Sequence, residues 1–302
     1  CDVITSICEK MDYNFYNIDD ISELRSILES TLKDKKYFYE IDPFIKINEP
    51  TIKILKVQNT DLVYSDDIDI NYDKENDVLN IFQKKEGSRI FFKNGSLKNI
   101  TINFISNYSN DKLVDFPIDN FGNTGCITFI GIEFFNVRLS SKNSNCEDAI
   151  NIVSSEGDLN NVNIRDSISD AFDADFSYID VNNFKIENAN NDCIDFSGGS
   201  YHLDNLTLNN CSDKGLSAEN SSIIVNNINI SNSLYGIASK DFSNVNIKKI
   251  FLDKVAICWD AYSKKQEFGG GKISINNFQS KSLCKPRENI DEGSKIEFSN
   301  VF

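Results

Sequence analysis

Apolar and polar residues alternate along most of the chain, and the alternation returns at a fixed interval. The segments 147–152, 169–174, 191–196, 213–218, 234–239 and 256–261 align with one another. Their third position is always small, and it is occupied by Ala149, Ala171, Cys193, Gly215, Gly236 and Cys258, at steps of 22, 22, 22, 21 and 22 residues. Alternation of this kind is typical of half-buried strands, and a constant step predicts identical units stacked on one another.

The predicted fold is therefore all-β: a single-stranded right-handed parallel β-helix, or solenoid, with an N-terminal α-helical cap. A second column supports the register, because each of its Asn residues lies between apolar neighbours. Its members are Asn161, Asn183, Asn205 and Asn227. Stacked strands lie about 4.8 Å apart, so we expect these amides to form a hydrogen-bonded ladder inside the turn.

The chain divides into two predicted regions. Residues 1–93 are expected to form a helix cap and irregular early rungs, and residues 94–302 the parallel β-helix with a C-terminal closing segment. Asp20 and Glu23 have the spacing of a capping box at the start of a helix over 20–36, which covers the open end of the solenoid or binds a partner. The polar loop 107–125 either borders a cleft or is a plain insertion.

Charge and length exclude some functions. The net charge of −15 over 302 residues argues against electrostatic binding of nucleic acid or an anionic membrane. The sequence has no apolar run of 18 residues, so no transmembrane segment is predicted. Cys1 is either the lipidated first residue of a mature lipoprotein or the cut end of a longer chain with further domains.

The eight cysteines do not fix a disulfide pattern. Cys193 and Cys258 share a column but lie three rungs apart, roughly 14 Å by the strand spacing, which is beyond disulfide reach. We interpret these two as small buried wedges. Pairing of Cys1 with Cys8, or of Cys126 with Cys146, stays open.

The candidate chemistry lies on one outward surface of the predicted sheet. Residues one and three places after the register position are apolar and should point inward, so those at two and four should point outward. The predicted catalytic residues are Asp170, Asp173, Asp192 and Asp195, and the predicted substrate-binding residues are Asp148, Asp175, Lys214, Glu219 and Lys240. No metal-ligand set is predicted, although calcium is a candidate cofactor for such a surface.

These carboxylates repel one another. Like charges about 5 Å apart at an effective dielectric near 20 repel by roughly 3 kcal/mol per pair. The repulsion must therefore be relieved in one of four ways: the pKa of at least one acid is raised, Lys214 pairs with an acid, a bound cation lies among the acids, or the acids lie in water as a solvated surface. Paired carboxylates serve glycoside hydrolysis, whereas a lyase or epimerase would need a base, for which Lys214 and Lys240 are the candidates. His202 lies in a different strand and is interpreted as structural.

One resemblance covers about residues 126–283. The motif-bearing runs are Asn145–Ile152, Ser169–Ser177, Asn191–Gly198, Asp213–Asn220, Gly236–Ser243 and Ala261–Gly269. They resemble the right-handed, pectate-lyase-like β-helix domain of bacterial surface proteins. That domain often accompanies a spore-coat-protein-H-like kinase domain, which is absent here. The resemblance implies a fold and a surface context rather than a reaction.

A second, shorter resemblance covers two rungs. The segments 169–173 and 191–194 resemble the two Asp motifs of polygalacturonase-type glycoside hydrolases, in which Asp170 and Asp192 would match catalytic acids. Asn191 stands where that family has a second Asp, Lys214 where it has His, and no Arg-Ile-Lys follows. Polygalacturonase activity itself is therefore not expected.

The sequence predicts an extracellular or envelope-associated protein that binds or processes a polysaccharide on its acidic sheet surface. If it is an enzyme, it is a glycoside hydrolase, a lyase or an epimerase acting on a polysaccharide. The alternative is a non-catalytic structural or adhesion stalk, whose repeats provide length and stability.

Overall fold

The computed structural model describes residues 52–106, 122–265, 267–285, 291 and 293–300. All of them lie in the second of two compact units, Pro50–Phe302. The predicted cap helix at 20–36, the pair Cys1 and Cys8, and most of the loop 107–125 fall outside the described residues. Within the described part, no helix is long and apolar enough to span a lipid bilayer.

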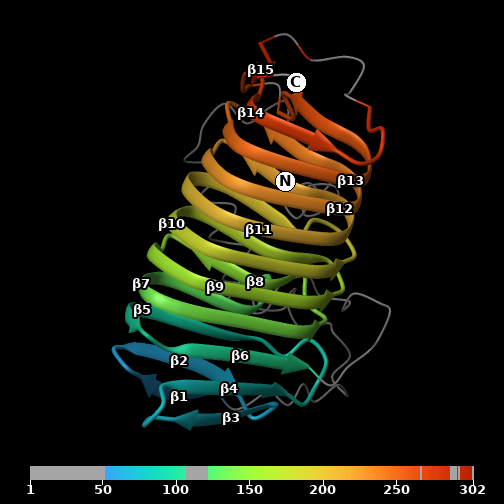
Figure 1. Ribbon diagram of the computed structural model, residues 1–302. Helices are drawn as coiled ribbons and strands as arrows, with labels where there is room; N and C mark the ends of the chain where they lie inside the picture. The colour runs from blue at the N-terminus through green and yellow to red at the C-terminus, as the bar shows by residue number, and fades with distance from the viewer. Residues whose placement is uncertain (1–51, 107–121, 266, 286–290, 292, 301–302) are drawn as a thin grey trace, which may run out of the picture. The chain divides into compact units, whose positions relative to one another are not determined.

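The described residues form strands joined into one sheet, which winds into a stack of turns (Figure 1). The strands are β1 (Ile52–Val57), β2 (Thr60–Ser65), β3 (Ile68–Asp73), β4 (Val78–Gln83), β5 (Ile90–Lys98), β6 (Thr101–Ser106), β7 (Gly125–Ser144), β8 (Asp148–Val153), β9 (Glu156–Ser167), β10 (Asp170–Ala189), β11 (Ile194–Glu219), β12 (Ser222–Lys240), β13 (Asn244–Tyr262), β14 (Lys272–Ser280) and β15 (Lys295–Asn300). This confirms the predicted all-β parallel solenoid; its right hand stays a prediction.

The first turns differ from the rest. The strands β1 and β2 pair antiparallel, as do β3 with β4 and β2 with β5, whereas from β5 and β6 onward each strand pairs parallel with the next turn. The uneven spacing of the early sequence thus corresponds to hairpins that lead into the parallel stack.

The predicted register is the observed one. Phe172 pairs with Ile150 on one side and with Ile194 on the other, a step of 22 residues each way. Within one turn the chain follows three sides of the solenoid, which we call side A (170–175 and the residues stacked on them), side B (178–181) and side C (183–187). The inward residues of all three sides form one continuous apolar core.

Left-handed residues bend the chain at recurring positions. Between sides A and B they are Ser154, Phe176, Gly198, Asn220 and Phe242, and after side C they are Asp166, Asn188, Asn210, Asn232 and Lys254, all with φ between 47° and 63° except Gly198 at 69°. Asn and Asp adopt this region more readily than other non-Gly residues. The repeat therefore encodes its corners as well as its strands.

The predicted Asn ladder has the right register but the wrong orientation. Asn183 pairs with Asn161 and Asn205, and Asn205 with Asn227, as predicted. The side chain of Asn205 is nevertheless exposed on side C rather than buried inside the turn. Asn227 Nδ2 still donates to Asn205 Oδ1 at 3.2 Å. Exposed amides have water as an alternative partner, so this column is not the internal support that the sequence suggested.

Other ladders of hydrogen-bonded side chains lie at the corners, where the chain bends. After side C, Asn188 Nδ2 donates to Asp166 Oδ1 at 2.7 Å, and Asn210 Nδ2 donates to Asn188 Oδ1 at 3.0 Å. Between sides A and B, the buried Ser177 Oγ accepts from Ser155 N at 3.1 Å. These ladders satisfy polar groups where the strands turn.

Three disulfides close individual turns: Cys126–Cys146, Cys193–Cys211 and Cys258–Cys284. The first is one of the two pairings that the sequence leaves open. Cys193 and Cys258 are buried and do not pair with each other, as expected, but they are not unpaired wedges, because each forms a disulfide with a cysteine 18 or 26 residues further along its own turn. Disulfides are typical of oxidising compartments such as the extracellular space.

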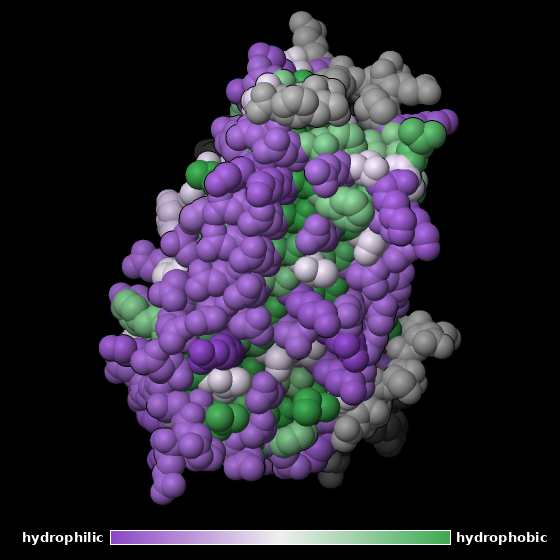
Figure 2. Space-filling model, viewed as in Figure 1, coloured by the Kyte–Doolittle hydropathy of each residue, from purple (hydrophilic) through white to green (hydrophobic). Residues whose placement is uncertain are grey.

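The visible outer surface is mostly hydrophilic, with an apolar strip running between the polar residues (Figure 2). Separately exposed large apolar residues of the described chain include Ile224, Leu234 and Phe242. Single apolar residues at a surface are ordinary in folded proteins.

One internal polar contact offers a test of the corner ladders. Gly199 replaces Ser in the column Ser155, Ser177, Ser221 and Ser243, and a Cβ at its position would lie 2.1 Å from Ser177 O. The buried Tyr201 hydroxyl takes over: it lies 3.4 Å from Ser177 N, 2.9 Å from Ala174 O and 2.8 Å from Gly198 O.

Replacing Tyr201 by Phe should therefore lower the free energy of unfolding by about 1–3 kcal/mol, because buried backbone groups lose their partner. Tyr178→Phe on the neighbouring turn is the matched control: its ring is exposed, so the expected change is under about 0.5 kcal/mol. Urea unfolding of both variants measures the difference. Equal stability of the two variants would show that the Tyr201 hydroxyl does not support the corner.

Candidate functional site

The predicted acidic residues meet on side A. Asp170 pairs with Asp148 on the preceding turn, and Asp173 pairs with Asp195 on the following one. Phe172 and Ala174 are buried in the core, so alternation directs the side chain of Asp173, and likewise that of Asp195, outward, whereas Asp148 and Asp170 are the first residues of β8 and β10. We call the outer surface that carries Asp148, Asp170, Asp173, Asp175, Asp192 and Asp195 the acidic face.

One column of the acidic face is tied to the backbone. Asp192 N donates to Asp170 Oδ1 at 2.8 Å, and Lys214 N donates to Asp192 Oδ1 at 3.0 Å. Each carboxylate thus accepts the amide of the corresponding residue one turn later. Asp148 and Asp192 are only 2% and 3% exposed. This column fixes the carboxyl groups in place and removes most of their water.

Burial raises the pKa values of several carboxyl groups on the acidic face. It brings the pKa of Asp170 to about 8, with a further contribution from the charge of Asp192. It brings the pKa of Asp148 to about 7, to which neighbouring carboxylates add. The pKa of Asp173 lies well above the ordinary value, again mainly through burial and then through Asp148, and burial also raises the pKa of Asp175. Several of these carboxyls therefore hold a proton near neutral pH.

Asp192 differs because a cation faces it. Burial raises its pKa, but the ammonium group of Lys214 opposes this effect and leaves the pKa at about 6. Lys214 Nζ lies 3.3 Å from Asp192 Oδ1 and also contacts Asp213. Burial alone would lower the pKa of Lys214, yet Asp192 and Asp213 outweigh burial and raise it, so the lysine stays charged. Two neighbouring carboxyls thus differ in protonation at pH 7.

The predicted binding residues Glu219 and Lys240 form an ion network at one edge of the acidic face. Lys240 Nζ lies 3.7 Å from Asp195 Oδ1 and 4.0 Å from Glu219 Oε2. Burial would raise the pKa of Glu219, but hydrogen bonds from Lys265 and Lys264 lower it. Neither lysine was among the predicted site residues, because both follow β13 and lie after the last aligned segment, 256–261.

Asn151 is a further member of this surface that was not among the predicted site residues, although its column was expected to point outward. Its Nδ2 atom lies 3.3 Å from Asp173 Oδ2 and 3.4 Å from Asp175 Oδ2, so one amide orients two carboxyls. By contrast, Asp148 Oδ2 is buried without a hydrogen-bond partner. Its raised pKa places a proton on this group, which lowers the cost of burying it.

The part of the chain that the structure describes has no group of three or more His, Cys, Asp or Glu side chains arranged to hold a metal ion. For calcium to bind the acidic face, its carboxylates would have to move closer together, since calcium takes six to eight oxygen ligands.

No family model matches this chain, and no curated protein or solved structure shows significant similarity to it. The resemblances to β-helix domains of surface proteins and to polygalacturonases thus rest on their motifs alone.

The raised pKa values predict how stability depends on pH. A carboxyl whose folded pKa lies above its unfolded value of about 3.8 costs nothing below that value, destabilises the fold progressively as pH rises from there to the folded pKa, and adds no further loss above it. A tenfold difference in acid dissociation constant between the unfolded and folded chains corresponds to about 1.4 kcal/mol. We therefore expect the free energy of unfolding to fall by several kcal/mol between pH 5 and pH 9.

Asp170→Asn should flatten this dependence and be more stable than the natural protein at pH 9, because the amide keeps an acceptor for Asp192 N but cannot ionise. Asp253→Asn on side C should keep the natural slope. Urea unfolding at pH 5, 7 and 9 provides the comparison. A slope unchanged by Asp170→Asn would contradict the assignment of this titration to the acidic face.

Proposed function

We propose that this protein is an extracellular or envelope-associated β-solenoid that binds or processes a polysaccharide on the acidic face. The observation that carries the proposal is the pair Asp170 and Asp192, neighbours in one column whose pKa values differ, about 8 against about 6. Two carboxyls whose environments separate their pKa values can take different catalytic roles, one as a protonated general acid and the other as an ionised carboxylate. The disulfides agree with an oxidising location.

The chemistry follows from the protonation states. At neutral pH Asp170 holds a proton that it can donate to a glycosidic oxygen, and Asp192, beside Lys214, is ionised. Carboxyls on adjacent turns are separated by about the 4.8 Å strand spacing, which is nearer to the roughly 5 Å of enzymes that use a carboxylate nucleophile than to the wider separation of those that activate water. Lys214 orients Asp192 and can contact a sugar hydroxyl.

A structural stalk is the second candidate, and a specific contact favours it. Asp170 and Asp192 each accept a backbone amide from the next turn. Carboxyls used in this way stabilise the corner where side A begins, and two such contacts on successive turns need no substrate to explain them.

The double variant Asp170→Asn/Asp192→Asn separates the two candidates. We expect it to reduce turnover of a polysaccharide by at least about 100-fold, as loss of general acid–base catalysis does, or to weaken binding at least tenfold where the protein only binds. A polysaccharide panel, assayed by affinity electrophoresis and by release of reducing ends with calcium or with chelator, provides the readout.

The control is Glu187→Gln/Asp253→Asn, which removes two negative charges from side C. Its binding and turnover of the polysaccharide should stay within twofold of those of the natural protein. If the panel yields no ligand, or if the acidic-face variant matches the natural protein while its melting temperature rises, the polysaccharide proposal is wrong and the stalk is favoured.

A further inference from the structure

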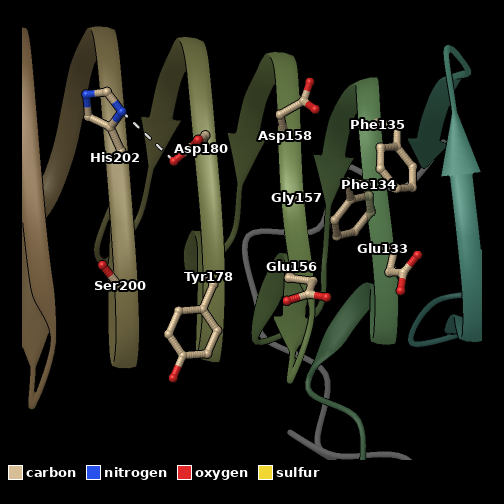
Figure 3. A pocket seen from close by; sticks show the side chains of 10 residues that line it. All are labelled: Glu133, Phe134, Phe135, Glu156, Gly157, Asp158, Tyr178, Asp180, Ser200 and His202. Atoms are coloured by element: carbon tan, nitrogen blue, oxygen red, sulfur yellow. Dashed lines mark ion pairs between the residues drawn. The ribbon is translucent and has the colours of Figure 1, made fainter.

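A second acidic surface lies on side B, away from the acidic face. It is a groove of about 580 Å³ that crosses strands β7, β9, β10 and β11 (Figure 3). Its carboxylates come from Glu133, Glu156, Asp158 and Asp180. None of these residues is among the predicted site residues.

The strand register arranges the groove in two rows. In one row Glu156 pairs with Glu133 and with Tyr178; in the other, Asp180 pairs with Asp158 and with His202. Figure 3 shows Glu156 and Tyr178 projecting near one end of their strands, with Asp158 and His202 nearer the other. The rows place like charges on adjacent turns, about 4.8 Å apart along the stack.

The described lining of the groove contains no Lys or Arg. Glu133 and Glu156 have no ion pair or hydrogen bond among the described residues. Asp158 accepts the backbone amide of Asn136 at 2.7 Å. Asp180 faces His202 Nδ1 at 3.9 Å.

Two acids elsewhere on the outside of the solenoid have cationic neighbours. Glu187 pairs with Arg165 and, at 3.1 Å, with Lys185, and Glu297 pairs with Lys272 at 3.3 Å. The groove is thus a place where stacking concentrates negative charge and the described chain supplies no lysine or arginine to balance it. A cleft lined by charges of one sign attracts ligands of the opposite charge.

Two aromatic rings complete the surface. Tyr178 is 64% exposed and Phe135 is 46% exposed. Rings exposed beside unpaired carboxylates suit ammonium and guanidinium groups, which bind aromatic faces as well as carboxylates.

We propose that this groove binds an extended basic segment of a partner protein, with Lys or Arg side chains against the carboxylates and Tyr178. Four strands stacked at 4.8 Å span about 14 Å, the length of about four or five extended residues. A neutral sugar would bring hydroxyls to the groove but leave the repulsion between its carboxylates in place, so the charge pattern favours a cationic chain. The proposal is independent of the polysaccharide site on side A.

The test uses a labelled six-residue peptide of alternating Arg and Ser, with its Glu-Ser counterpart as the negative probe. Fluorescence anisotropy at 0.15 M salt, where the Debye length is about 8 Å, limits long-range attraction to an acidic protein. Glu156→Gln/Asp158→Asn should weaken binding at least tenfold, because two of the four carboxylates lose their charge. Tyr178→Ala should weaken it about threefold or more, and Tyr178→Phe should not.

The matched control is again Glu187→Gln/Asp253→Asn, which removes the same charge from side C and should change affinity less than twofold. Thermal melting of each variant confirms that it folds. If both double variants weaken binding equally, the attraction is general and the groove proposal is wrong. It is also wrong if the groove variants affect binding of a neutral oligosaccharide and not of the peptide.

Discussion

In-register stacking of parallel strands is the constraint on which the rest of this structure depends. Each residue lies about 4.8 Å from its equivalent on the next turn, so residues of the same type form columns along the axis. For apolar residues such as Phe172 and Ile194 the repetition builds a continuous core. For carboxylates it brings like charges together, and the same register that stabilises the inside creates an electrostatic problem outside.

The corners show how the stack meets another requirement, hydrogen-bond partners for the polar groups that are buried where the chain turns. Between sides A and B and after side C, a left-handed residue turns the chain, and side chains hydrogen-bond an amide or a side chain of the adjacent turn. Where Gly199 removes a hydroxyl from the Ser column, Tyr201 supplies one from two residues further on. The ladder of hydrogen bonds is thereby preserved, because the amide needs a hydroxyl oxygen beside it and either Ser or Tyr can supply one.

The period and the inward positions could be predicted because both follow from alternation at a fixed step. The orientation of Asn205 could not, since a column of Asn at constant spacing looks the same inside a corner or outside a strand. The pairing of Cys193 could not be predicted for a related reason: the repeat relates equivalent residues on different turns, whereas Cys193 pairs within its own turn with Cys211. The columns point to the acidic face, but Lys264 and Lys265 lie beyond the repeat.

The two acidic surfaces show how burial decides what stacked carboxylates do. On side A the groups have lost most of their water, so the charged form is penalised and protons are retained, as the pKa values of Asp148 and Asp170 show. On side B, Glu156 and Asp180 border an open groove and keep their contact with solvent, so repulsion is relieved by water or by a cation from outside. One repeat thus supports two kinds of acid surface. The first is suited to proton transfer and the second to binding positive charge, and the difference lies in desolvation rather than in residue type.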